Sequence, residues 1–325
     1  MSVFPDGVFQ YGGEPVGGVR FTSPWATTYF VDGDNGNAAN SGLKPTLATA
    51  LLTTAVAKAG EEDIIYVRPM GASTDASDFY YYADGATITV PYASVNLSII
   101  GVTPHRHKPY YGPWFRFGYG ASDTGYVLDN YAPGLCLENL GFQTGDYIRT
   151  SYGAVRLYSS TTGGAYTTHA GSVGCSIYNC FFRDGQITIN GGYDTVIAGS
   201  TFEASSSSNT GIWSIDNALP TGGHRIIGCH FNEMFADNQP LRYIYFVAGQ
   251  QVNFYVHECY FGLVPADNHY MWFGASSKGL VDSCYFENAD ISTGANDSNS
   301  ELYSADGGVQ FTNIHDGSRA APGAD

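Results

Sequence analysis

Six segments between Leu137 and Phe286 repeat one spacing of apolar and turn-forming residues. Each begins with a branched apolar residue, places a turn-type residue two positions later, and ends with a Phe five positions after the first. The Phe residues are Phe142, Phe182, Phe202, Phe231, Phe261 and Phe286. Side chains on one face of a straight strand recur every second residue. The residues five and two positions before each Phe are three positions apart, and both are expected to point inward. A straight strand cannot place both on one face, so a corner must lie between them.

The corner position is occupied by residues that favour tight turns in four of the six segments. It stands three positions before each Phe and is filled by Asn139, Asn179, Gly199, Gly228, Glu258 and Ser283. Asn and Gly tolerate the left-handed backbone conformation, whereas Glu258 and Ser283 fit it less well. The next position holds Leu140, Cys180, Ser200, Cys229, Cys259 and Cys284, which we expect to point inward.

The interval between successive segments is irregular, although the spacing within them is constant. It runs from 20 residues, between Phe182 and Phe202, to 40 residues, between Phe142 and Phe182. This pattern predicts a solenoid of parallel strands, a β-helix, whose coils carry loops of different length. The alternatives are chance recurrence in a β-rich chain and the blades of a propeller. A propeller blade needs about 40 residues, so the shortest interval argues against it.

A strand, a helix and a second strand are predicted before the first coil. Residues 29–31 and 63–67 are strand-like, and the intervening helix is expected from Thr46, behind Pro45, to Gly60. Such a helix would cover the open end of a solenoid, where strand edges and apolar side chains are otherwise exposed. The acidic run that starts at Asp32 favours a turn over a calcium site, because it lacks the terminal Glu of a calcium-binding loop.

These segments resemble the right-handed parallel β-helix proteins of the pectate-lyase-like superfamily. The resemblance rests on residues 29–67, which are similar to the first strand and capping helix, and on the coil segment at residues 177–182, and it spans residues 29–286. It implies an all-β, right-handed parallel β-helix with an N-terminal capping α-helix. It implies little about activity, because the superfamily includes polysaccharide lyases, glycoside hydrolases, phage tailspikes and non-catalytic virion proteins.

The chain is expected to divide into four parts. Residues 1–26 form an extended arm, residues 27–68 the first strand and capping helix, residues 69–314 the β-helix with its loops, and residues 315–325 a tail. The arm is either a disordered leader or an anchor that lies along another protein through Phe4, Phe9, Tyr11 and Val16. It resembles the short leaders of β-helix proteins from tailed phages.

Composition and charge limit the kinds of binding partner and the compartment that are expected for the chain. A formal net charge of −16 over 325 residues argues against nucleic-acid binding, which relies on Lys and Arg. No apolar run is long enough to cross a membrane, and no secretory signal opens the chain. The six cysteines lack the close pairs of a zinc site. Thiols stacked in successive coils would point in parallel directions, which is poor geometry for a disulfide. We therefore interpret the cysteines as buried apolar residues suited to a reducing compartment.

Candidate catalytic residues are sparse. Glycoside hydrolysis needs two carboxylates about 5–9.5 Å apart, and Asp184, Glu203 and Glu233, which follow the Phe positions, are the candidates in neighbouring coils. The same residues could equally be solvated carboxylates at loop edges. No metal or cofactor is predicted.

Two functional classes remain. The favoured hypothesis is a non-enzymatic virion protein, a trimeric decoration or cement protein that is assembled in the host cytoplasm and held on a phage capsid by its arm, with the major capsid protein or another virion protein as partner. The alternative is a tailspike-like receptor-binding protein or polysaccharide depolymerase with a surface polysaccharide as ligand. A secreted carbohydrate enzyme is disfavoured by the absent signal.

Overall fold

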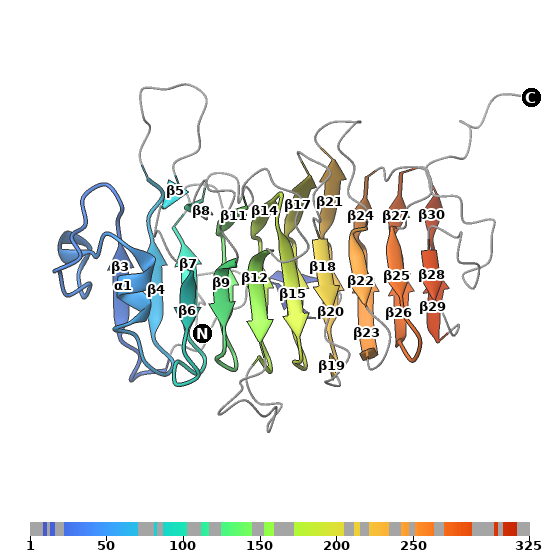
Figure 1. Ribbon diagram of the computed structural model, residues 1–325, viewed down its shortest axis with the longest axis horizontal. Coiled ribbons are helices and arrows are strands. Elements are labelled where there is room, and N and C mark those ends of the chain that lie inside the picture. The colour runs from blue at the N-terminus through green and yellow to red at the C-terminus, as the bar shows by residue number, and fades with distance from the viewer. Residues whose placement is uncertain are drawn as a thin grey trace, which may run out of the picture.

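In the computed structural model the chain forms three parallel β-sheets that run along one common axis, and successive coils stack along that axis (Figure 1). The structure describes residues 9–11, 14–16, 23–70, 81–82, 87–102, 112–116, 125–144, 153–158, 172–204, 211–214, 221–233, 242–246, 251–262, 270–287, 302–304 and 308–316. Within these residues the chain visits the three sheets in turn, and each visit to all three makes one coil. The fold is therefore a parallel β-helix.

Each sheet gathers the same strand from successive coils. The 11-stranded sheet contains β3 (Thr28–Val31), β4 (Ile64–Val67), β7 (Ser98–Gly101), β10 (Cys136–Glu138), β13 (Ser176–Tyr178), β16 (Val196–Ala198), β19 (Thr221–Gly222), β20 (Arg225–Ile227), β23 (Gln251–His257), β26 (Lys278–Asp282) and β29 (Val309–Thr312). The nine-stranded sheet contains β5 (Tyr81–Tyr82), β8 (Trp114–Arg116), β11 (Gly141–Gln143), β14 (Phe181–Arg183), β17 (Thr201–Ala204), β21 (His230–Glu233), β24 (Tyr260–Phe261), β27 (Tyr285–Phe286) and β30 (His315–Asp316). The eight-stranded sheet contains β6 (Ile88–Val90), β9 (Tyr126–Asn130), β12 (Gly153–Tyr158), β15 (Gln186–Asn190), β18 (Gly211–Ser214), β22 (Ile244–Phe246), β25 (Met271–Phe273) and β28 (Leu302–Ser304).

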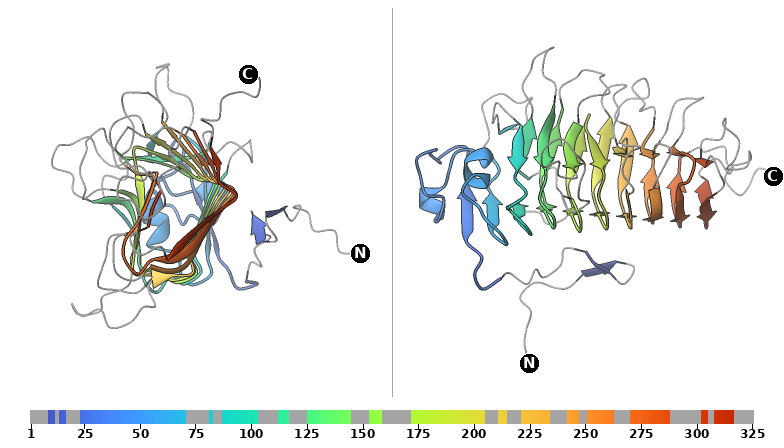
Figure 2. Two further views of the ribbon diagram at one scale, coloured as in Figure 1. Left: turned by 90° about the vertical axis from the view of Figure 1, so that its right-hand side faces the viewer. Right: turned by 60° about the horizontal axis from the view of Figure 1, so that its bottom comes forward.

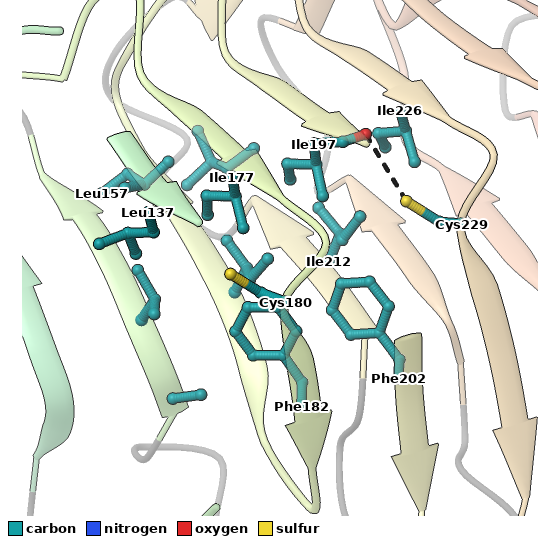
Figure 3. Close-up of a cluster of buried hydrophobic side chains, with 14 of the residues drawn as sticks. Leu137, Leu157, Ile177, Cys180, Phe182, Ile197, Phe202, Ile212, Ile226 and Cys229 are labelled. Carbon is teal, nitrogen blue, oxygen red and sulfur yellow. Dashed lines mark hydrogen bonds between the residues drawn. The ribbon is translucent and has the colours of Figure 1, made fainter. Parts of the chain in front are cut away.

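The repeated Phe residues lie in one register of the nine-stranded sheet. Phe142 pairs with Phe182, Phe182 with Phe202, and the series continues to Phe286. Their rings stack at 4.6–5.5 Å between centroids and are fully buried. The column also extends one coil earlier, to Phe115, which lies 5.8 Å from Phe142. Figure 3 shows two of these rings, Phe182 and Phe202, packed beside aliphatic side chains of the other two sheets.

The corner between the 11-stranded and nine-stranded sheets has one backbone conformation throughout. All six corner residues have positive φ, from 48° at Asn179 to 58° at Gly199, and this includes Glu258 at 51° and Ser283 at 54°. A seventh corner at Asn313, with φ 50°, continues the series. The side-chain amide of Asn179 donates a hydrogen bond to Oδ1 of Asn139, so the two Asn corners also stack on each other.

The cysteines are buried thiols without disulfides. Cys180, Cys229, Cys259 and Cys284 follow the corners, where each thiol donates to a backbone carbonyl, as Cys229 does to Ile197 O at 3.6 Å (Figure 3). Burial raises the pKa of Cys175 to about 12 and that of Cys180 further still. These thiols therefore act as small core residues.

The helix before the first coil is shorter than the sequence predicts. Only α1 (Leu52–Val56) is α-helical, and Pro45–Leu47 forms a separate 3-10 turn, η1. Between them Thr49 pairs with β3: its N–H donates to Phe30 O, and its carbonyl accepts from Asp32 N–H, both at 2.9 Å. This extended segment prevents a continuous helix from Thr46. The buried face of α1 packs against β3, β4 and β6.

The arm contains a short hairpin. Strands β1 (Phe9–Tyr11) and β2 (Glu14–Val16) pair antiparallel in a two-stranded sheet of their own. Figure 2 shows this hairpin beside the stack of coils rather than within it. No helix among the described residues is long and apolar enough to span a membrane.

Candidate functional site

The predicted carboxylates lie on the outer face of the nine-stranded sheet. Since the Phe column points inward, the next residue on each strand points outward. Arg183, Glu203 and Asn232 occupy that outer position in successive coils. Asp184 follows Arg183, and its backbone N–H donates to Glu203 O at 2.9 Å. The fold thus brings Asp184 and Glu203 into neighbouring coils.

The environments of these two carboxylates differ. Burial raises the pKa of Glu203; the Arg183 charge opposes this rise, and the Asp184 charge adds to it. Asp184 is only 3% exposed and has positive φ, and its carbonyl accepts a hydrogen bond from the Thr144 hydroxyl. The carboxylate of Glu203 is therefore protonated more readily than an ordinary Glu, whereas Asp184 has little access to solvent.

The third predicted carboxylate is placed only by its backbone. Glu233 pairs with Ala204 in the adjacent coil, and its side chain lies outside the described residues. Hydrolysis would require an ionised carboxylate and an activated water opposite the proton donor. On the described face, Glu203 is the carboxylate whose pKa is raised by burial.

A second outer row was not predicted from the sequence. It runs along the eight-stranded sheet from β6 to β25, with one residue from each strand, and contains Thr89, Asp129, Arg156, Thr188, Trp213, Tyr245 and Trp272. The signal was available in triplets such as Met271-Trp272-Phe273, where an outward aromatic residue stands between two inward ones. This sheet has no corner motif that would set its register from the sequence.

In the first half of this row, two neighbouring residues, Asp129 and Arg156, form an ion pair. Arg156 Nε lies 2.8 Å from Asp129 Oδ1, and Nη2 lies 2.6 Å from Oδ2. The guanidinium carbon is 4.6 Å from the ring centroid of Tyr126 and 4.9 Å from that of Tyr158. A bidentate pair between two rings leaves Arg156 little capacity to bind a ligand.

Beside the second half of the row lies Arg242, a cation without a carboxylate partner among the described residues. The guanidinium carbon of Arg242 lies 4.4 Å from the Tyr245 ring and 4.0 Å from the Trp272 ring. Burial lowers the pKa of Arg242. The indole N–H of Trp213, which is 7% exposed, finds no hydrogen-bond partner in the part of the chain that the structure describes. These four residues, Trp213, Arg242, Tyr245 and Trp272, are called the aromatic patch below.

The anchoring residues proposed for the arm are placed in part. Phe9 pairs with Val16, and Tyr11 pairs with Glu14, in the β1–β2 hairpin. Phe4 and the arm's side chains lie outside the described residues. Within the described ranges, no group of three or more His, Cys, Asp or Glu side chains is arranged to hold a metal ion.

Comparisons with known proteins support the fold. No protein family and no curated protein sequence matches the chain. Among solved structures, a rhamnogalacturonan lyase is similar with a TM-score of 0.53 and 11% identity over 81% of this chain and 68% of that one. Weaker likenesses, too low to carry an argument, are Geobacillus virus E2 ORF18 (TM-score 0.39, 13% identity, 70% of this chain and 45% of that one) and Escherichia coli ybhc (TM-score 0.41, 12% identity, 94% and 89%). At 11% identity the first likeness establishes a shared β-helix fold and no activity.

Proposed function

We propose that this chain is a non-enzymatic virion protein, a trimeric decoration or cement protein held on a phage capsid by its N-terminal arm. The observation that carries the proposal is the β1–β2 hairpin, which pairs only within itself among the described strands and lies beside the coils. A segment that pairs with none of the described coil strands can instead contact another protein. The acidic surface and the buried, unbridged thiols suit assembly in a reducing cytoplasm.

In this proposal the coils act as a rigid body. Helix α1, whose Leu52, Ala55 and Val56 are buried, would cap the N-terminal end of the coils. Three copies would pack around an axis and stabilise the shell by adding buried interface.

The test is deletion of residues 1–25. We expect the shortened protein to keep the β-helix and its thermal transition but to lose co-sedimentation with purified capsids of the encoding phage. A matched control is Tyr285→Ala, which changes a half-exposed side chain on the nine-stranded sheet. Retained co-sedimentation of the deletion protein would contradict anchoring by the arm.

The aromatic patch favours a second candidate function, binding of a surface saccharide. Aromatic rings stack on the apolar faces of sugar rings, and a guanidinium without an ion pair can bond to hydroxyl or carboxylate oxygens. Titration of a panel of bacterial surface polysaccharides against tryptophan fluorescence would detect binding. Trp272→Ala and Arg242→Gln should each abolish the signal, and Tyr285→Ala should leave it unchanged. Absence of any signal with the host's own polysaccharide would exclude this function.

Cleavage is a separate question from binding. If the chain hydrolyses a polysaccharide, Glu203 is the expected proton donor, because burial raises its pKa. New reducing ends that disappear in Glu203→Gln, but persist in Glu287→Gln on the same sheet face, would establish an enzyme and overturn the structural proposal. No product from the wild-type protein would support it.

A further inference from the structure

The three rings of the aromatic patch stand in register on successive strands of the eight-stranded sheet. Trp213 on β18 pairs with Tyr245 on β22, and Tyr245 pairs with Trp272 on β25; Figure 1 shows these strands side by side. The ring centroids lie 5.0 Å apart between Trp213 and Tyr245, and 5.1 Å apart between Tyr245 and Trp272. Tyr245 and Trp272 are only half-buried, so parts of their rings face outward. Together they offer an apolar surface that suits the face of a sugar ring.

Arg242 lies over this surface through contacts that do not neutralise its charge. Its guanidinium contacts the rings of Tyr245 and Trp272, and among the described residues its hydrogen bond is with Tyr245. An aromatic ring and a neutral hydroxyl carry no full negative charge, and Arg keeps its proton at every physiological pH. A guanidinium has five N–H donors, so several of them remain for an acceptor from outside the described residues.

Trp213 adds a buried donor on the same face of the sheet. Its indole N–H has no hydrogen-bond partner in the part of the chain that the structure describes, although the residue is only 7% exposed. Buried donors in folded proteins are almost always paired, because an unpaired one has lost its bond to water without replacement. The unpaired N–H therefore indicates that an acceptor reaches this position from outside the described residues.

The other arginine of the row shows what the chain does when a cation is purely structural. Arg156 also lies over two rings, but it is held in a bidentate pair by Asp129, which lies three strands away from Trp213. The chain has 30 Asp and Glu residues for 14 Lys and Arg, so carboxylates are not scarce. The absence of one beside Arg242 within the described ranges leaves that position open to an external anion.

We propose that the aromatic patch binds a glycan through an acidic group, a carboxylate or a phosphate carried on a sugar ring. Arg242 and the indole N–H of Trp213 would donate to the acidic group, and Tyr245 and Trp272 would lie against the sugar. Two N–H donors, one of them charged, favour an anionic acceptor over a neutral hydroxyl. The net charge of −16 repels acidic ligands, but 0.15 M salt screens this beyond about 8 Å, so the local donors decide. This inference rests on the second candidate function above, saccharide binding at the patch, and specifies the class of saccharide.

The test uses three glycosides that differ in one substituent: methyl β-D-glucoside, methyl β-D-glucuronide and methyl β-D-glucoside 6-phosphate. Ligand-observed NMR with the full chain at pH 7 and 0.15 M salt gives each Kd. We expect at least one acidic glycoside to bind at least about fivefold more tightly than the neutral one, the size of one partly exposed ion pair. The two acidic probes distinguish a carboxylate from a phosphate. Arg242→Gln should reduce the affinity for the acidic probe to that for the neutral one. The matched control Lys278→Gln removes an exposed charge from the 11-stranded sheet and should keep the difference.

Equal affinities for the three glycosides, no binding of any of them, or a preference that survives in Arg242→Gln would overturn the acidic class. Equal affinities that are all lost in Trp272→Ala would leave saccharide binding at the patch intact, and the polysaccharide titration above decides that function separately. If Arg242→Gln does not fold, Trp213→Phe provides the second test, because it keeps a ring and removes the N–H. It should weaken binding of the acidic probe at least about twofold, and an affinity equal to that of the wild type would also overturn the proposal.

Discussion

The rings of Phe202 and Phe231 lie 4.7 Å apart with only 7° between their planes, although 29 residues separate them in the sequence. Both are fully buried, in a column that continues through every described coil from Phe115 to Phe286. Each ring therefore fills space for two neighbouring coils, and its loss leaves a cavity between them.

Replacement of Phe231 by Ala should destabilise the protein by about 3–5 kcal/mol, the cost of removing a buried aromatic ring and leaving a cavity. Phe231→Leu keeps most of the volume and should cost about 1.5 kcal/mol or less. Urea unfolding followed by circular dichroism measures both values. The surface control Leu43→Ala, at a residue that is 50% exposed, should change stability by less than about 0.5 kcal/mol. Equal losses for the Ala and Leu variants would argue against the packed column.

The corner at Gly199 isolates the cost of the left-handed backbone. Its φ is 58°, and an added Cβ would meet no atom within 4 Å, so no clash complicates substitution. Gly199→Ala should cost about 1 kcal/mol, and Gly199→Asn should cost less, because Asn adopts this conformation more readily. Thermal unfolding of the two variants checks the order. A more stable Ala variant than Asn variant would contradict the corner geometry.

The carboxylate of Asp32 should make the free energy of unfolding depend on pH in the acidic range. Burial alone would raise its pKa, but hydrogen bonds from Arg68 and from Asn35 and Asp34 lower it below the ordinary value. Its contribution is therefore complete above the unfolded-state pKa, near 3.9, and is lost as the pH falls through the lower folded-state value. We expect Asp32→Asn to lose about 1 kcal/mol at pH 7 and progressively less below pH 4. Chemical unfolding between pH 2.5 and 7 measures this, with the exposed Glu61→Gln as control; a loss that persists undiminished at pH 2.5 would contradict it.

The thiols should report unfolding of the coils. All six are buried, and burial raises the pKa of Cys175 and Cys180, so neither access nor ionisation favours reaction. A thiol reagent at pH 8 should label none of them in the native protein and all six in denaturant. Rapid labelling of Cys229 or Cys259 without denaturant would show that the column is open.

The repeated segments allowed the coil order and the Phe column to be predicted, because an odd spacing between inward residues requires a corner. The sequence predicted the left-handed corner in four of the six segments, but Glu258 and Ser283 adopt it as well. They adopt the left-handed conformation despite unfavourable propensity, since the stacking of neighbouring coils determines their backbone. The corner at Asn313 was missed because Asp316, rather than Phe, occupies the column there.

The functional surfaces were harder to predict. Asp184 and Glu203 follow directly from the Phe register, so the sequence placed them in adjacent coils. The aromatic patch did not follow, because loops of variable length separate the eight-stranded sheet from the repeated segment, and Arg242 reaches Trp272 only through the coil stacking. The short length of α1 was also not predicted, because it results from the pairing of Thr49 with β3, which local helix propensity does not reveal.

The most direct test of the proposed function is quantitative mass spectrometry of gradient-purified particles made by the genome that encodes this chain. A decoration protein should be present in many copies per particle, in a fixed ratio to the major capsid protein, and should be lost from particles when residues 1–25 are deleted. If the chain is absent from the particles, or is present in only the few copies typical of a tail fibre or spike, the capsid role is wrong.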